Sequence, residues 1–377
     1  MKKLVLALFL VPVLSFGQTI HLLDSVIYYN NDSTNSLVLS SKDEFTFDAN
    51  SNGTLRVNYN WDLATNSWLG TYKTESTFDA NSNQTLLSNY TWDLVANSWL
   101  ENNKTESTFD ANSNQTLRVS YTWDLATNSW LKNNKTESTF DSNSNQTLGA
   151  NYTWDLATNS WLGTYKTESA FDVNNQPILQ LFYSWNIISN SWIGSYKCEY
   201  GYNNNNQILY IAYIWDLSTN FWIESVKDVT THDANNNIAT NIRYNWDLVA
   251  NSWLENNKTE STFDANSNQT LRVSYTWDLA TNSWLKNNKT ESTFDSNSNQ
   301  TLGANYTWDL ATNSWLENNK IESTFDANSN QTLGANYTWD LATNSWKGTY
   351  KTESTFDSNS NQTLGANYTW DLATNSW

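Results

Sequence analysis

The sequence predicts an all-β protein made of antiparallel β-hairpins in tandem, two strands in each unit of about 31 residues, coiled into a spiral or solenoid sheet. Three observations predict it: paired tryptophans at a fixed period, apolar residues that alternate, and turn-forming residues between the alternating segments. The 22 tryptophans form pairs written Y-x-W-x6-W, from Trp61 and Trp68 to Trp370 and Trp377. Self-similarity at such a period is typical of repeat architectures.

The repeat divides the chain into three parts. Residues 1–17 read as a signal peptide, residues 18–58 as a divergent N-terminal capping repeat, and residues 59–377 as eleven Trp-pair repeats. In the cap, Asn30 and Leu37 stand where the two tryptophans should be, as expected for a terminal unit whose outer face meets water. The last repeat is incomplete, because the sequence stops at Trp377, and we expect a truncated C-terminus.

Within a unit the apolar period is two, which is typical of a half-buried strand. In the first strand, Leu55, Val57, Tyr59 and Trp61 fall on one side. In the second strand, alternation from Trp68 predicts one face with Tyr72, Thr74, Ser76 and Phe78, and an opposite, solvated face with Lys73, Glu75 and Thr77. The segments Asp79–Gln84 and Asp93–Ser98, rich in Asp, Asn and Ser, are predicted to be the turns.

The aromatic rows determine the expected coiling. A sheet of roughly 22 strands rarely stays flat, because twist curls or splits sheets beyond about ten strands. Burying a Trp removes on the order of 150 to 250 Å², worth at most about 4 to 6 kcal/mol. We therefore expect the Trp, Tyr, Phe and Leu rows inside the coil. The alternative is a flat sheet whose aromatic face is covered by another molecule.

Composition indicates an exported protein. The basic residues Lys2 and Lys3, the apolar run Leu4–Leu14 and the small residues Ser15 and Gly17 predict a secretory signal peptide cut before Gln18. The chain is therefore expected to be secreted or displayed on a bacterial cell surface. A net charge of −18 disfavours nucleic acid as a partner, and no later apolar stretch is long enough to span a membrane. The single cysteine, Cys198, excludes an internal disulfide framework.

The turn Phe78–Thr85, read F-D-A-N-S-N-Q-T, resembles the YD repeats of RHS-type bacterial surface proteins. That resemblance implies hairpins wound into a spiral β-sheet shell. The signal peptide followed by Asn- and Thr-rich tandem repeats is also similar to adhesin-like proteins exported by type IX secretion. Both resemblances imply a secreted or surface-exposed protein.

Two kinds of binding site are candidates. Asp48, Asn50 and Asn52 match the opening of an EF-hand loop and could offer oxygen ligands to calcium, or they could simply form an Asx turn. The Trp rows could stack on sugar rings or could be core. The candidate glycan-stacking residues are Trp61, Trp68, Trp92, Trp99, Trp123 and Trp130.

No catalytic residues are predicted. His21 and His232 lack a nucleophile and base nearby in the sequence, and copies with near-identical surroundings do not provide the two unequal carboxylates of a glycosidase. The sequence thus predicts a non-catalytic secreted or cell-surface protein that acts as an extended structural or adhesive scaffold, without a cofactor. The alternative is a carbohydrate-binding array. The expected partners are surface glycans or other extracellular proteins.

Overall fold

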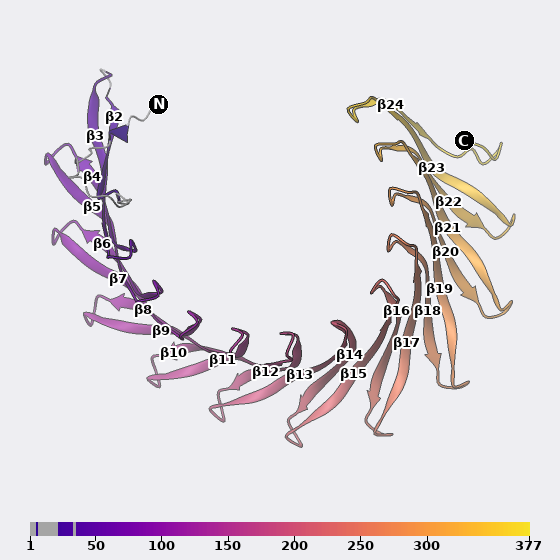
Figure 1. Cartoon of the computed structure of the whole chain (residues 1–377), viewed down its shortest axis with the longest axis horizontal. Coiled ribbons are helices and arrows are strands. Elements are labelled where there is room, and N and C mark those ends of the chain that lie inside the picture. Colours follow the sequence, from indigo (N-terminus) through magenta and orange to yellow (C-terminus); the bar gives the residue numbers. More distant parts are fainter. Residues whose placement is uncertain (1–4, 7–21, 33–34) are drawn as a thin grey trace, which may run out of the picture. The chain divides into compact units, whose positions relative to one another are not determined.

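The structure is a computed structural model that describes residues 5–6, 22–32 and 35–377. The predicted signal peptide, apart from Val5 and Leu6, lies outside these residues. The chain forms two compact units, Met1–Ser195 and Tyr196–Trp377. Within each unit, consecutive strands pair antiparallel in a β-meander, hairpin after hairpin (Figure 1). The described residues contain no helix able to cross a membrane.

The strands of a repeat are about equally long. In chain order they are β1 (Val5–Leu6), β2 (Ser25–Asn31), β3 (Leu37–Phe47), β4 (Gly53–Asp62), β5 (Ser67–Phe78), β6 (Gln84–Asp93), β7 (Ser98–Phe109), β8 (Gln115–Asp124), β9 (Ser129–Phe140), β10 (Gln146–Asp155), β11 (Ser160–Phe171), β12 (Pro177–Asn186), β13 (Ser191–Asn203), β14 (Asn206–Asp216), β15 (Phe221–His232), β16 (Ile238–Asp247), β17 (Ser252–Phe263), β18 (Gln269–Asp278), β19 (Ser283–Phe294), β20 (Gln300–Asp309), β21 (Ser314–Phe325), β22 (Gln331–Asp340), β23 (Ser345–Phe356) and β24 (Gln362–Tyr368).

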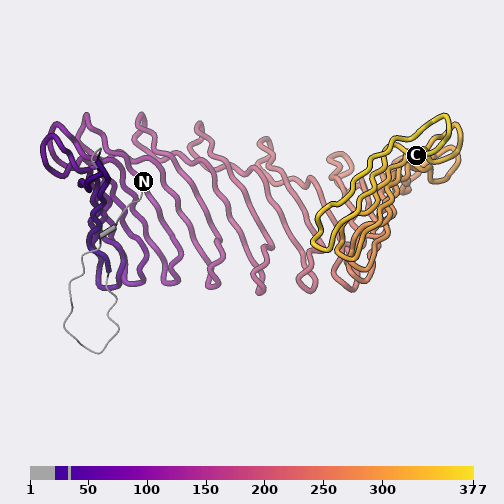
Figure 2. Tube along the Cα trace, turned by 90° about the horizontal axis from the view of Figure 1, so that it is seen from above, coloured from indigo at the N-terminus to yellow at the C-terminus, as the bar shows by residue number. Residues whose placement is uncertain are grey.

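Two kinds of turn join these strands, and the trace in Figure 2 shows them at opposite ends of the hairpins. The first kind, which we call the Asn turn, is residues 48–52 and their equivalents. Asp48 Oδ1 accepts hydrogen bonds from the backbone N–H groups of Asn50 and Asn52, both at 2.9 Å. The Asn52 side chain donates to Asp48 Oδ2 and to Ser82 Oγ, in the Asn turn of the next repeat. The Asn turns are therefore linked to one another.

The second kind, which we call the Leu turn, is the four-residue loop Leu63–Asn66 and its equivalents. Asp62 accepts hydrogen bonds from the backbone N–H of Ala64 and from the hydroxyl of Thr65. Asn66 takes the left-handed conformation at φ 51°. Asn tolerates this conformation better than most residues because its short side chain bonds locally.

A β-bulge that recurs in the hairpins changes which residues share a face. Tyr59 pairs with Gly70 and Asn58 pairs with Tyr72, so Thr71 is one extra residue on β5. A slip of one residue moves every following side chain to the other face of a sheet. The predicted faces of the second strand are therefore wrong beyond Gly70.

The two faces can now be defined. The first strand is as predicted, and Lys73 pairs with Val57 and Glu75 with Leu55, so the charged pair lies on the same face as the tryptophans. We call this the aromatic face. The opposite face, which we call the second face, carries Tyr72, Thr74 and Ser76.

Each unit has little core. Among the described residues, no large side chain is fully buried, and the buried apolar residues are small: Val57, Val119, Ala150, Cys198, Ala212, Val273, Ala304 and Ala335. The close contacts are between consecutive strands. The tryptophans are half-buried by neighbours in the same sheet rather than by a second layer. The all-β hairpin meander is confirmed, and its coiling into a spiral or solenoid stays a prediction.

Replacing Ser144 by Asn should stabilise the protein. Ser144 has φ 63° and accepts a hydrogen bond from Asn114, while the equivalent Asn175 has the same φ and accepts the same bond from Asn145. Ser144→Asn should therefore keep the link and suit the left-handed conformation better, which raises the unfolding free energy by roughly 0.5 kcal/mol.

Urea unfolding measures this difference. Ser142→Asn, in the same turn but without a positive φ, is the matched control and should change little. A stabilisation of equal size from both substitutions would contradict the role of the left-handed position.

Candidate functional site

The aromatic face carries the same pair of tryptophans in each of the eleven Trp-pair repeats. Trp92 on β6 and Trp99 on β7 are cross-strand partners, with ring centroids 5.0 Å apart and planes at 78°. Such edge-to-face contacts add about 0.5 to 1.5 kcal/mol to the burial of the rings. The other Trp pairs have centroid separations of 4.9 to 5.1 Å. The pair closes each hairpin next to its Leu turn.

A Lys and a Glu from the preceding hairpin lie against this cluster. Lys73 Nζ is 3.8 Å from the centroid of the Tyr90 ring and 5.9 Å from that of Trp99. The same ammonium pairs with Glu75 at 2.9 Å, and the Tyr90 hydroxyl donates to the other oxygen of Glu75 at 2.7 Å. One Lys–Glu pair thus joins strands β5, β6 and β7. Corresponding Lys–Tyr contacts recur in most other repeats.

The residue two positions after the second Trp decides what lies against the next Trp pair. At Gly70 the backbone is so close to Trp92 and Trp99 that a Cβ would approach their ring carbons to 2.6 and 2.7 Å. The same close approach brings Trp99 to 6.3 Å from the ring of Tyr59. In a later repeat this position is Lys132, whose Nζ lies 4.2 Å from the centroid of Trp154. In these repeats, backbone or a cation therefore packs on the aromatic pair.

The cluster shifts the ionisation of its own members. Burial, with the hydrogen bond to Glu106, raises the pKa of Tyr121 to about 12. Burial also raises the pKa of Glu106, but the hydrogen bonds from Lys104 and Tyr121 outweigh it and leave that pKa below its ordinary value. The same holds for Tyr90 and Glu75 in the preceding repeat. The charged carboxylate and the neutral phenol are thus both favoured near neutral pH.

The six candidate glycan-stacking residues lie together on the aromatic face. Trp61, Trp68, Trp92, Trp99, Trp123 and Trp130 are half-buried and form three edge-to-face pairs. The indole N–H groups of Trp92 and Trp123 are buried without an acceptor, next to the partner indole. The rings thus contact their neighbours extensively, although part of each ring remains exposed.

The calcium candidates Asp48, Asn50 and Asn52 lie together in an Asn turn. Both carboxylate oxygens of Asp48 accept hydrogen bonds from this turn, and those from Asn52 lower the Asp48 pKa. No cluster of three or more His, Cys, Asp or Glu that could hold a metal occurs in the described part of the chain. The Asp48 carboxylate is engaged as an Asx turn requires.

The two histidines and the single cysteine lie in the second unit or outside the described residues. His21 is outside the described residues, and His232 stands at the end of β15. Cys198 is 3% exposed, with Sγ 3.6 Å from the hydroxyl of Tyr210, which also bonds to Tyr196. Burial raises the pKa of Tyr210. This phenol cluster on the second face was not predicted, because it arises only where the repeats have diverged.

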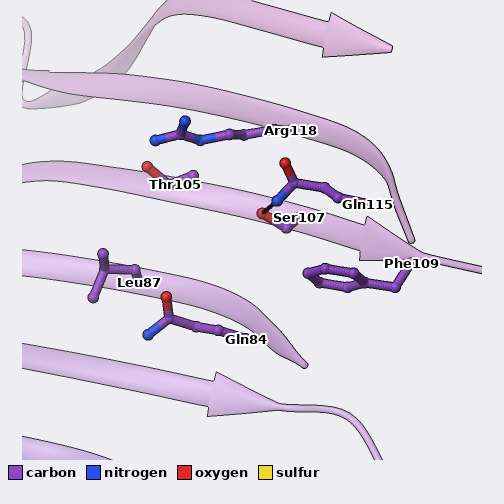
Figure 3. A pocket seen from close by; sticks show the side chains of 7 residues that line it. All are labelled: Gln84, Leu87, Thr105, Ser107, Phe109, Gln115 and Arg118. Atoms are coloured by element: carbon purple, nitrogen blue, oxygen red, sulfur yellow. Dashed lines mark hydrogen bonds between the residues drawn. The ribbon is translucent and has the colours of Figure 1, made fainter. Parts of the chain in front are cut away.

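A hollow of about 290 Å³ lies on the second face of the first unit, over β6, β7 and β8 (Figure 3). Gln115 donates to Ser107 along its floor, at 3.1 Å. Phe109 lies at one end and Arg118 crosses the opposite side. The hollow is lined by Gln84, Leu87, Thr105, Ser107, Phe109, Gln115 and Arg118.

Four tyrosines of the Y-x-W positions should titrate late. Burial, with the hydrogen bond to a Glu, raises the pKa of Tyr90, Tyr121, Tyr275 and Tyr306 above the unfolded value of 10, to about 12. This contribution to stability is therefore complete below pH 10 and is lost as the pH rises towards 12.

The ultraviolet absorbance of tyrosinate follows this titration. We expect two phases in the folded chain and one phase near pH 10 in the urea-unfolded chain. A single phase near pH 10 in the folded chain would contradict the Tyr–Glu contacts.

No protein-family model and no curated protein sequence matches this chain. Three distant structural matches show what it is similar to. A protein of unknown function from Bacteroides fragilis is 19% identical over 34% of this chain and 91% of its own, with a TM-score of 0.26. A DUF3836 family protein from Bacteroides vulgatus is 12% identical over 30% of this chain and 98% of its own, with a TM-score of 0.21. The Tc holotoxin pore of Photorhabdus luminescens is 9% identical over 93% of this chain and 23% of its own, with a TM-score of 0.26.

Proposed function

We propose that this chain is a non-catalytic, secreted or cell-surface repeat protein that acts as an extended structural or adhesive scaffold. The observation that supports it best is the Lys–Glu–Tyr–Trp cluster, which joins one hairpin to the next in most repeats. In the cluster of Lys73, Glu75 and Tyr90, both the cation and the carboxylate bond to neighbouring strands. Because the stability of a repeat protein is approximately a sum over neighbouring repeats, each added cluster contributes to the stability of the sheet.

The scaffold explains the aromatic face better than a carbohydrate-binding array does. A sugar stacks on the open face of an aromatic ring. In this sheet Lys ammonium groups lie over the rings of Tyr90 and Trp154, and a strand backbone packs on Trp92. The half-exposed parts of the indoles keep glycan binding as the competing function.

Further features of this proposal come from the sequence. The signal peptide supports export, and the net charge of −18 supports partners other than nucleic acid, such as surface glycans or extracellular proteins. Coiling of the sheet into a spiral, as in the RHS-type proteins that the YD-like turns resemble, would cover more of the aromatic face.

Tryptophan fluorescence separates the two functions. For a scaffold we expect emission that resists aqueous quenchers in part, because the rings are half-buried, and that does not move with oligosaccharides. The companion experiment is binding of the full chain to a glycan array. Emission that shifts with one oligosaccharide class, together with array binding lost in Trp92→Ala, would favour the carbohydrate-binding array.

Deleting a whole period should be tolerated. Removing residues 100–130 joins Trp99 to Leu131 and restores the same turn, strand and face order. Removing only residues 100–114 takes out most of β7 and its Asn turn, so one Leu turn follows another and the turns and strand faces on the two sides of the deletion no longer match.

Circular dichroism and urea unfolding compare the two variants. We expect the full-period deletion to keep the unfolding transition and the half-period deletion to lower the midpoint markedly. Equal damage by both deletions would contradict the repeat scaffold.

A further inference from the structure

Every Leu turn from Leu63 onwards presents a large apolar side chain to solvent. The first turn residue is exposed by 68 to 75% in all of them. Three turns add a second apolar residue, exposed by 94 to 98%: Val95, Ile188 and Val249. The row comprises Leu63, Leu94, Leu125, Leu156 and Ile187 in the first unit, and Leu217, Leu248, Leu279, Leu310, Leu341 and Leu372 in the second.

The turn itself does not require an apolar residue there. In this turn Asp62 accepts hydrogen bonds from the Ala64 N–H and the Thr65 hydroxyl, and Asn66 takes the left-handed conformation. Where the repeats have diverged, the turn Asp becomes Asn186 and the Thr becomes Ser189, but the first turn residue stays apolar as Ile187. A polar residue at this exposed place would form the same loop, so the apolar side chain has another use.

The spacing of the row indicates what it contacts. Successive Leu turns are two strands apart, which at about 4.8 Å per strand places the side chains roughly 10 Å from one another. A Leu side chain fills about half of that distance, so the row consists of apolar knobs separated by gaps of similar width. A second row of the same period, shifted by half a repeat, places its own knobs in the gaps.

We propose that the Leu turns are a docking surface for a second copy of this chain, whose own row of Leu turns interdigitates with the first. Only a partner with the same 10 Å period fills all the gaps, and another copy has that period by construction. A two-fold axis makes the contact the same for both copies. This inference goes beyond the scaffold role and holds whether or not the aromatic face binds a ligand.

The apolar area in one unit suits such a contact. The seven exposed apolar side chains of the first unit are Leu63, Leu94, Val95, Leu125, Leu156, Ile187 and Ile188. At roughly 60 to 120 Å² for each side chain, they expose apolar surface on the order of 500 Å². That is more than half of the about 800 Å² that each partner contributes to a standard interface. Polar turn atoms between the knobs supply the rest.

Charge gives this association a distinctive salt dependence. Each copy carries a net charge of −18, so two copies repel one another at low ionic strength. Salt screens this repulsion and leaves the apolar contact in place. Association through the Leu turns should therefore strengthen with salt, whereas association through ion pairs would weaken.

The test is sedimentation of the full chain over a range of concentrations and salt, with a reductant present because of Cys198. We expect a monomer–dimer equilibrium at micromolar concentration. The Leu-turn variant, which should weaken dimerisation at least a hundredfold, carries Leu63→Asn, Leu94→Asn, Leu125→Asn and Leu156→Asn.

The matched control changes the opposite ends of the same hairpins. It carries four exposed Asn-turn substitutions and should dimerise like the wild type: Ala49→Asn, Ala80→Asn, Ala111→Asn and Ser142→Asn. Circular dichroism of both variants verifies that they are folded.

Three results would overturn the proposal. The first is a wild-type chain that stays monomeric at high concentration and high salt. The second is a Leu-turn variant that dimerises as well as the wild type. The third is a monomer that instead binds phosphatidylcholine vesicles through the Leu turns, which would make a lipid surface the occupant.

Discussion

The contact between Lys73 and the rings of Tyr90 and Trp99 is the interaction on which the repeat sheet depends, and it exists because of one extra residue. The bulge at Thr71 turns Lys73 and Glu75 onto the aromatic face. Without it, this charged pair would face solvent on the opposite side of the sheet. With it, the pair covers the next hairpin's Tyr and Trp and ties three strands together.

This arrangement explains how a sheet with little core can be ordered. Edge-to-face Trp pairs hold the two strands of one hairpin together, whereas Lys groups over aromatic rings and the Asn52–Ser82 link connect one hairpin to the next. Each of these contacts stabilises the sheet by a modest amount. Repetition along the chain multiplies them, so stability comes from neighbouring hairpins rather than from a central core.

The two ends of the hairpins differ in chemistry. The Asn turns bond to one another through polar side chains, whereas the Leu turns direct apolar side chains into water. The polar side chains of the Asn turns are therefore hydrogen-bonded within the sheet, whereas the Leu turns offer a regular apolar surface. A scaffold that associates through one end leaves its faces accessible to other partners.

The sequence by itself determined the period, the strands, both turns and the place of the first strand's aromatic residues, because periodicity of two and turn chemistry are local properties. The six candidate tryptophans share one face and Asp48, Asn50 and Asn52 share one turn, and the binding roles of both groups stay predictions. Only the tertiary structure decided the faces of Lys73, Glu75 and Phe78, because a bulge depends on the register between two strands. The exposure of Leu63 was likewise beyond the sequence, since an apolar residue beside a Trp pair reads as core until the turn is seen to hold it in solvent.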